Sequence, residues 1–379
     1  MTMVSSERGT RLARHRRRAW RHGGLGLSAL LVLLGAVPAS AQGPASAPRG
    51  VPGPLFTADD VLDLTIEGPL SHVIKERGDD KESFPGTVRY RAASGNEIVI
   101  PVVLRTRGNF RLRAKTCGFP PLRLEFEPSA TLGTVFEGQG RLKLVTHCQD
   151  GRAEYEQFVL QEYLIYRIYE LLTPRSFRAR LAHITYLDDD GKREPVTRYG
   201  FFLEPEEVMA ERNGMEGLHV PVVAPEQMEQ ADLVRLEVFQ FLIGNTDWEP
   251  FQPEKGEKYC CHNAVLIGSM WDQVVIPVPY DFDWSGVISA PYARPAPTLG
   301  IRSVRERRYW GVCRPRAQLD AALPEFRAQR DAIHRLVREQ PGLEPKRAER
   351  MIEYLDEFYG IIGDPHRVSR EMEAKCRGG

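Results

Sequence analysis

Residues 141–174 have the sequence RLKLVTHCQDGRAEYEQFVLQEYLIYRIYELLTP, in which the spacing of apolar residues changes once. Residues 141–145 alternate polar and apolar side chains, which predicts a half-buried strand. Residues 153–172 repeat apolar side chains at helical spacing, and Thr173-Pro174 then ends the helix. The expected apolar face of this helix comprises Phe158, Tyr163, Leu164, Ile168 and Leu171. At this point a strand-rich first half of the chain begins to give way to helices.

The elements expected on either side of this stretch define a fold class. Strands are predicted before it at residues 61–67, 87–91, 97–107 and 122–126, and after it at 179–187 and 199–203. Long amphipathic helices are predicted at residues 225–243, 319–339 and 346–362. This order favours an α+β protein with two lobes, a β-rich lobe over 55–203 and a helical lobe over 204–379, with a cleft between them.

The N-terminal residues are typical of an export signal. Residues 11–21 are basic, residues 25–37 are apolar, and Ala39-Ser40-Ala41 has the small-x-small pattern of a cleavage site. We therefore expect a signal peptide over 1–41, followed by a Pro/Gly-rich linker over 42–54. A membrane anchor is the alternative, but the apolar run is shorter than the ~20 residues that a spanning helix needs. The prediction is an exported protein, periplasmic or secreted, whose mature chain has no integral membrane span.

Composition and charge narrow the choice of partners. The chain has 379 residues, of which 42% are hydrophobic and 27% charged, which excludes a disordered polymer. Beyond residue 41 there are 44 basic and 50 acidic residues, so we expect no nucleic-acid partner, because such binding depends on a basic surface.

Six cysteines in an exported chain favour disulfides. Cys117 is expected to pair with Cys148, and Cys313 with Cys260 or Cys261. Zinc is the alternative, but no CxxC pair is present.

The residues with catalytic potential concentrate between 244 and 286. Asp247 follows the long helix of 225–243, Asn263 precedes a strand over 264–267, and Asp281 follows a strand over 274–278. A hairpin returns its two ends to one place, so these side chains should converge. Hard oxygen ligands of this kind suit Mg²⁺, and phosphoryl transfer uses them. The alternative is that they are ordinary turn residues, because Asp and Asn favour turns.

Several short motifs in this order resemble the CotH-like kinases, an atypical family with a protein-kinase-like fold related in layout to the HipA-type kinases. Those near the proposed metal site are residues 245–247 (NTD), 262–263 (HN) and 280–283 (YDFD). Upstream, residues 105–109 (RTRGN) resemble the family's RG-containing strand, and 199–204 (YGFFLE) resemble its hinge strand. The resemblance covers residues 88–288, and the order and spacing of its motifs carry most of it.

The resemblance implies an exported kinase that transfers phosphate from ATP to an unknown hydroxyl acceptor, which could be a secreted or envelope protein. Asp247 would be the catalytic base, and Asn263 and Asp281 would bind Mg²⁺, with Asp283 as a further metal ligand. The nucleotide would be bound by Lys143, Arg107, Glu162 and Glu204. Glu162 or Glu156 would pair with Lys143. Two features depart from the kinase pattern: sixteen positions separate Asp247 from Asn263, and the first half has no GxGxxG loop.

Three functions therefore compete. The first is the ATP- and Mg²⁺-dependent phosphotransferase. The second is a catalytically inactive relative that acts as an envelope binding module, since ATP is scarce outside the cytoplasm. The third is a metal-dependent hydrolase that uses Asp281 and Asp283. The basic residues between 105 and 123 are either an anion site for phosphates or an acidic substrate, or a solvated face of the sheet.

Overall fold

The strand and the helix of residues 141–174 form as predicted. The computed structural model describes residues 53–378, except 270, 272, 297 and 298. Strand β5 is Arg141–Val145 and helix α2 is Glu154–Glu170. The prediction for Leu171 was wrong, because the helix ends before it and its side chain is exposed. The expected signal peptide, and the expected linker apart from its last two residues, lie outside the described residues.

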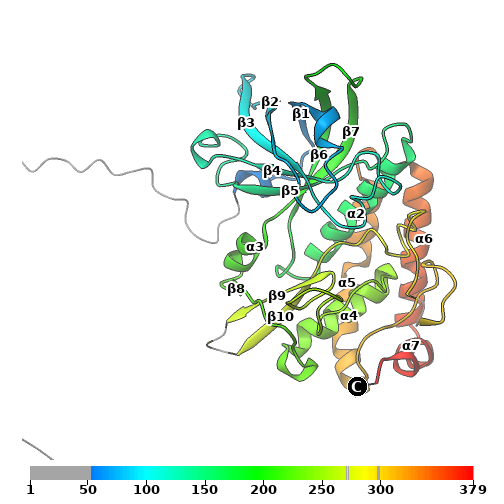
Figure 1. Ribbon diagram of the computed structural model, residues 1–379. Helices are drawn as coiled ribbons and strands as arrows, with labels where there is room; N and C mark the ends of the chain where they lie inside the picture. Colours follow the sequence, from blue (N-terminus) through cyan, green and yellow to red (C-terminus); the bar gives the residue numbers. More distant parts are fainter. Residues whose placement is uncertain (1–52, 270, 272, 297–298, 379) are drawn as a thin grey trace, which may run out of the picture. The chain divides into compact units, whose positions relative to one another are not determined.

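The other predicted strands and helices appear in the predicted order with changed ends (Figure 1). The remaining strands are β1 (Leu62–Gly68), β2 (Phe84–Arg91), β3 (Glu97–Thr106), β4 (Leu122–Glu125), β6 (Ala179–Asp188), β7 (Val196–Leu203), β8 (Glu216–Gly217), β9 (Ala264–Ser269) and β10 (Val274–Pro279). The remaining helices are α1 (Leu70–Val73), α3 (Glu206–Arg212), α4 (Gln230–Ile243), α5 (Arg316–Arg338), α6 (Pro345–Ile362) and α7 (Pro365–Glu371). The protein is therefore α+β, as predicted, although α1, α3, α7 and β8 were not themselves predicted.

The expected two-lobed, protein-kinase-like arrangement was wrong. Within the described residues, β1 to β7 close into a barrel in the order β1-β2-β3-β4-β5-β7-β6. Closure comes from a parallel pairing of β1 with β6, which runs from Leu62 opposite Ala182 to Gly68 opposite Asp188. The two strands are distant in sequence, and their alternating patterns do not identify each other as partners. Closing the sheet pairs both of its edges, which would otherwise expose unpaired backbone groups.

The barrel and the helices have separate cores that share three strands, β5, β6 and β7. The inner core contains Leu64, Ile100, Leu144 and Phe202, among other side chains. On β7 the preceding residue, Phe201, points the other way and packs in the helical core. Successive strand residues face opposite sides of a sheet, so this part of the barrel wall is buried on both faces. Helix α2 contacts β6 and β7 on that outer face, which fixes the helix against the barrel.

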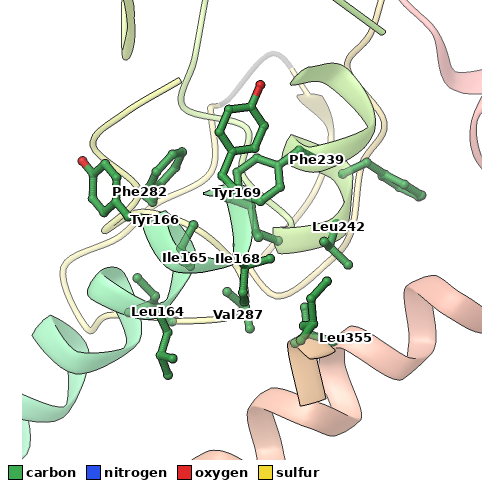
Figure 2. Close-up of a cluster of buried hydrophobic side chains, with 14 of the residues drawn as sticks. Leu164, Ile165, Tyr166, Ile168, Tyr169, Phe239, Leu242, Phe282, Val287 and Leu355 are labelled. Atoms are coloured by element: carbon green, nitrogen blue, oxygen red, sulfur yellow. The ribbon is translucent and has the colours of Figure 1, made fainter. Parts of the chain in front are cut away.

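Helix α2 also lies at the centre of the helical core. Figure 2 shows Tyr169 of α2 close to Phe239 of α4, with Phe282 beside Tyr166 of α2. The expectation that the helix of 225–243 is amphipathic was wrong for α4, because side chains on all its sides are buried. Its buried acids have cationic partners: Asp232 pairs with Arg175 and Arg235, and Glu237 pairs with Arg314. Residues 225–227 form a separate 3-10 turn.

Three cysteine pairs lie at disulfide distance among the described residues: Cys117–Cys148, Cys260–Cys261 and Cys313–Cys376. The first pair was predicted and is confirmed. The expected partner of Cys313 was wrong, because the neighbouring Val312 and Arg377 form a backbone bridge that brings Cys376 to it. Disulfides are typical of exported proteins, and this set is compatible with export. None of the described helices combines the length and the apolar character needed to cross a membrane.

Candidate functional site

A cavity of about 510 Å³ brings together most of the residues singled out in the sequence. Its basic wall comes from β5 and from the loop that follows β3. Its acidic wall comes from the loop after α4 and from the outer ends of the β9–β10 hairpin. The residues from the sequence prediction that line it are Arg107, Lys143, Asp247, Asn263, Asp281 and Asp283. The cavity therefore brings cationic side chains and carboxylates together.

Asp247 is positioned by a tight turn at the end of α4. Gly244 ends the helix in the left-handed conformation, with φ of 65°. The side-chain oxygen of Asn245 then accepts a hydrogen bond of 3.0 Å from the backbone N–H of Asp247. The indole of Trp248 donates to the carbonyl of Asn245 at 3.1 Å, and Trp248 is buried. These contacts hold the backbone on both sides of Asp247, so its carboxylate has a defined direction.

His262 and Asn263 both bind Asp247. Nε2 of His262 lies 3.0 Å from Oδ1 of Asp247, and Nδ2 of Asn263 donates to Oδ2 at 3.1 Å. Nδ1 of His262 lies 3.3 Å from Glu254. The hydrogen bond to Asp247 raises the pKa of His262, although partial burial of the ring opposes the rise. The ring of His262 is therefore held between the carboxylates of Asp247 and Glu254.

The long interval between Asp247 and Asn263 has a structural explanation. Glu249 and His262 exchange two backbone hydrogen bonds of 2.9 Å, which closes the intervening residues into a loop. The loop carries the Cys260–Cys261 pair, and Cys261 lines the cavity. The chain between Asp247 and Asn263 thus forms a loop whose two ends meet. The interval of sixteen positions therefore does not separate the two residues in space.

The segment 280–283 is fixed by alternating contacts. The backbone N–H of Tyr280 donates to the carbonyl of Asn263 at 3.1 Å, and that of Asp281 donates to the hydroxyl of Tyr166 at 2.9 Å. Phe282 is fully buried in the helical core. The Asp281 side chain is 41% exposed and the Asp283 side chain only 9%. Burial raises the pKa of Asp283 well above its usual range, Arg111 opposes the rise, and Asp281 adds to it.

Arg111 is the central cation of the acidic wall, and the sequence did not single it out. Its guanidinium lies 3.0 Å from Glu162, 2.9 Å from Asp281 and 3.4 Å from Asp283. The only signal for it was membership of the basic run between 105 and 123. Burial raises the pKa of Glu162, which Arg111 counteracts. The expectation that Glu162 pairs with Lys143 was therefore wrong, because Glu162 is the partner of Arg111.

The basic wall lacks the predicted acidic partner from α2. Lys143 extends over the ring of Tyr280, 5.5 Å from its centroid, and burial together with repulsion from Arg107 lowers its pKa. Burial also lowers the pKa of Arg107. Glu156, the other expected partner of Lys143, accepts a hydrogen bond of 2.6 Å from the backbone N–H of Tyr199. The lysine and the arginine are thus two cations close together at the cavity, an arrangement that suits a polyanion.

Glu204 is placed elsewhere. Its carboxylate is fully buried and accepts hydrogen bonds from Arg212 at 2.9 and 3.1 Å and from the backbone N–H of Arg178 at 3.0 Å. These contacts join the end of β7 to α3. Glu204 is therefore a buried ion-pair partner of Arg212. It is not among the described residues that line the cavity.

A second acidic group lies away from the cavity. Among the described residues, Asp188, Asp189 and Asp190 are the group of three His, Cys, Asp or Glu residues whose ligand atoms all lie within 4.8 Å of one another. Asp188 accepts hydrogen bonds from the backbone N–H groups of Ser71 and Lys192, and Asp190 pairs with Lys192. These contacts are those of a turn that follows β6 and is held to α1.

Comparison with protein-family models gave no match, and comparison with curated proteins gave none. The chemistry of the cavity therefore has to be inferred from its own residues.

Proposed function

We propose that this protein is a phosphotransferase that uses ATP and Mg²⁺ and acts on a hydroxyl acceptor outside the cytoplasm, in the periplasm or after secretion. The observation that carries the proposal is one cavity that is lined both by Arg107 and Lys143 and by Asp247, Asn263 and Asp281. Transfer of a phosphoryl group needs cations for its oxygens and a carboxylate for the attacking hydroxyl. The resemblance to CotH-like kinases supports the same reaction. Because the closed barrel is not the fold that this resemblance implies, the proposal rests on the cavity.

The residues of the acidic wall fit Mg²⁺ in kind. Carboxylate and amide oxygens are the ligands that this ion prefers. Asn263 directs its Nδ2 to Asp247, so Oδ1 is the atom that a cation would use. Asp281 and Asp283 would supply the carboxylates. When bound, Mg²⁺ would neutralise charge on the phosphates.

The chain's own residues would do the rest of the work. Arg107 and Lys143 would bind phosphate oxygens. Asp247 would accept a hydrogen bond from the acceptor hydroxyl and take its proton as the hydroxyl attacks. Asn263 and His262 would keep the Asp247 carboxylate pointed into the cavity, through the contacts of 3.1 and 3.0 Å.

Thermal unfolding of the oxidised protein with Mg²⁺, ATP or both tests nucleotide binding. Ligand at ~100 times its dissociation constant should stabilise the fold by ~2.7 kcal/mol, which is a measurable rise in the midpoint. Asp281→Asn should remove the rise. Glu257→Gln is the matched control, because Glu257 lines the same cavity and is exposed. If neither ATP nor Mg²⁺ shifts the midpoint of the wild type, the proposal is wrong.

Transfer itself needs a second measurement. With labelled ATP and a mixture of envelope proteins as acceptors, the wild type should transfer label. Asp247→Asn should lower the rate by about 10²–10⁴-fold, the usual contribution of a general base, while ATP still stabilises the variant.

A specific observation favours a second candidate, a nucleotide- or phosphate-binding protein without turnover. Arg111 lies between Asp281 and Asp283, where a catalytic metal would be needed. Under this alternative ATP raises the unfolding midpoint, no label is transferred, and Asp247→Asn behaves as the wild type.

A further inference from the structure

Arg111 uses three separate nitrogens on three separate carboxylates. Nη1 contacts Glu162, Nη2 contacts Asp281 at 2.9 Å, and Nε lies 3.4 Å from Asp283. The Arg111 side chain is 11% exposed and that of Glu162 is 2% exposed. At such low exposure ion pairs are poorly screened by solvent, so the guanidinium is held strongly at this point.

The loop that carries Arg111 is fastened on both sides. Next to it, the ring of Phe110 packs against Trp284 and Tyr292, with centroids 5.0 and 5.8 Å apart. Farther along, Arg77 donates to the carbonyl oxygens of Leu112, Cys117 and Gly118. Cys117 is also joined to Cys148. Arg111 is therefore placed by its surroundings and is not a surface side chain that happens to reach the acids.

One guanidinium neutralises only one of the three carboxylates that it contacts. The position between Asp281 and Asp283 is a cation position already filled by a side chain. A divalent cation shared by these two carboxylates has to compete with the guanidinium. Glu162 offers Arg111 a partner that it can keep when it releases Asp281, because both Glu162 oxygens face it, at 3.0 and 3.5 Å.

We propose that Arg111 is a built-in competitor of the divalent cation at Asp281 and Asp283, an inference that rests on the proposed function for the identity of the metal site. In the free protein the guanidinium neutralises part of the acidic wall. A divalent cation gains this position only by displacing Arg111 from Asp281 toward Glu162. The affinity of the site for a divalent cation is therefore set by Arg111 as well as by the oxygen ligands.

Direct titration with Mn²⁺, followed by electron paramagnetic resonance, tests this without nucleotide or turnover. Mn²⁺ prefers the same oxygen ligands as Mg²⁺. We expect Arg111→Gln to bind Mn²⁺ at least about tenfold more tightly than the wild type, a change of about 1.4 kcal/mol. Arg111→Gln combined with Asp281→Asn should lose this gain. The double variant also separates the cavity from any binding at Asp188–Asp190, which would remain.

Arg113→Gln is the matched control. Arg113 lines the same cavity but is exposed, and its guanidinium lies over the ring of Phe110. This substitution removes the same charge from the same loop and should change Mn²⁺ affinity less than twofold. Equal gains in the two variants would show a general charge effect and overturn the proposal. A folded Arg111→Gln protein with wild-type Mn²⁺ affinity would overturn it as well.

Loss of Arg111 leaves Glu162 buried without its cation, so the Gln variant could fail to fold. Arg111→Lys covers that outcome, because lysine keeps the charge but cannot reach three carboxylates at once. It should bind Mn²⁺ more tightly than the wild type, and unchanged affinity would again refute the proposal.

The results distinguish this inference from the proposed function. If Arg111→Gln gains Mn²⁺ affinity but no variant binds ATP or transfers phosphate, the result supports Arg111 as a competitor of the cation. The same result rejects the proposed phosphotransferase function. Phosphate transfer by the wild type without any gain of Mn²⁺ affinity in Arg111→Gln would do the reverse.

Discussion

The backbone N–H of Asp281 donates a hydrogen bond of 2.9 Å to the hydroxyl oxygen of Tyr166. Tyr166 lies on α2, in the middle of the helical core, and is 3% exposed. Asp281 has a positive φ of 58°, a conformation that a non-glycine residue rarely adopts without support. The hydroxyl of Tyr166 thus connects the helical core to the candidate site and holds the backbone of Asp281.

Tyr166→Phe should therefore lower stability and loosen Asp281. The substitution leaves a part-buried N–H without its protein partner, which costs at most about 1–3 kcal/mol. Tyr155→Phe on the same helix is the control, because the Tyr155 hydroxyl has only a contact of 3.5 Å with an exposed arginine. Urea unfolding of both variants measures the difference. Equal losses of unfolding free energy would mean that the hydroxyl does not support Asp281.

Gly244 connects the packing of α6 to the position of Asp247. A Cβ atom at Gly244 would lie 1.8 Å from the hydroxyl oxygen of Tyr354, on α6, and the residue has φ of 65°. Gly244→Ala should therefore cost about 2–5 kcal/mol, the sum of left-handed strain and overpacking. Gly214→Ala separates the two causes, because Gly214 has φ of 69° and no heavy atom within 4 Å of its Cβ position.

Chemical denaturation should give a loss of only about 1–2 kcal/mol for Gly214→Ala, the left-handed term alone. Adding Tyr354→Phe to Gly244→Ala should recover part of the larger loss. If the two glycine variants are equally stable, the close approach to Tyr354 is not a constraint on the turn that carries Asp247.

Local patterns in the sequence predicted elements well and long-range pairings poorly. Strand β5 has its predicted bounds, because alternation over five residues is a local signal. The hairpin that brings Asn263 beside Asp281 is also local, since only four residues separate its two strands in the sequence. The pairing of β1 with β6 is not local, and many of the alternating strands could have satisfied β1. The closed barrel was therefore beyond the reach of pattern analysis.

The residues of the candidate site also divide into those placed by local patterns and those placed by long-range contacts. Asp247, Asn263 and Asp281 stand at the ends of predicted elements, so their convergence follows from those elements. Arg111 is one of several basic residues in a loop, and nothing in the pattern shows which of them turns inward. That choice depends on Phe110 packing against Trp284, a contact between residues 174 positions apart. For this reason the sequence did not predict that Glu162 pairs with Arg111 and not with Lys143.

The Cys117–Cys148 disulfide should order the Arg111 loop as well as stabilise the fold. Closing a loop of 31 residues stabilises by about 3–4 kcal/mol in the chain-entropy model. The Cys313–Cys376 pair closes 63 residues and should contribute slightly more. Replacing each pair by alanines gives two variants of similar stability, which makes them controls for each other.

Hydrogen exchange then separates the two disulfides. Amides of residues 108–118 should exchange faster in the variant without Cys117–Cys148. Their exchange rates should not change in the variant without Cys313–Cys376. Similar exchange of this loop in both variants would show that Arg77 and Phe110 hold it without the disulfide.

Glu170 at the end of α2 should make stability depend on pH. Burial raises its pKa from 4.5 to about 7, while Arg167 opposes the rise, and the side chain is 22% exposed. Because the folded protein holds this proton more tightly than the unfolded chain, its stabilising contribution is present below pH 4.5. That contribution is lost as pH rises toward 7.

Glu170→Gln stays neutral over this range and should remove the loss. Relative to the wild type, the variant should gain up to about 3 kcal/mol of unfolding free energy between pH 4.5 and pH 8, at 1.36 kcal/mol for each pKa unit. Glu353→Gln, at an exposed position of α6, is the control and should show no such trend. Denaturant unfolding at five pH values measures the difference. A gain that stays constant with pH would mean that Glu170 is ionised alike in the folded and unfolded chain, because a pKa shift is the only source of the expected slope.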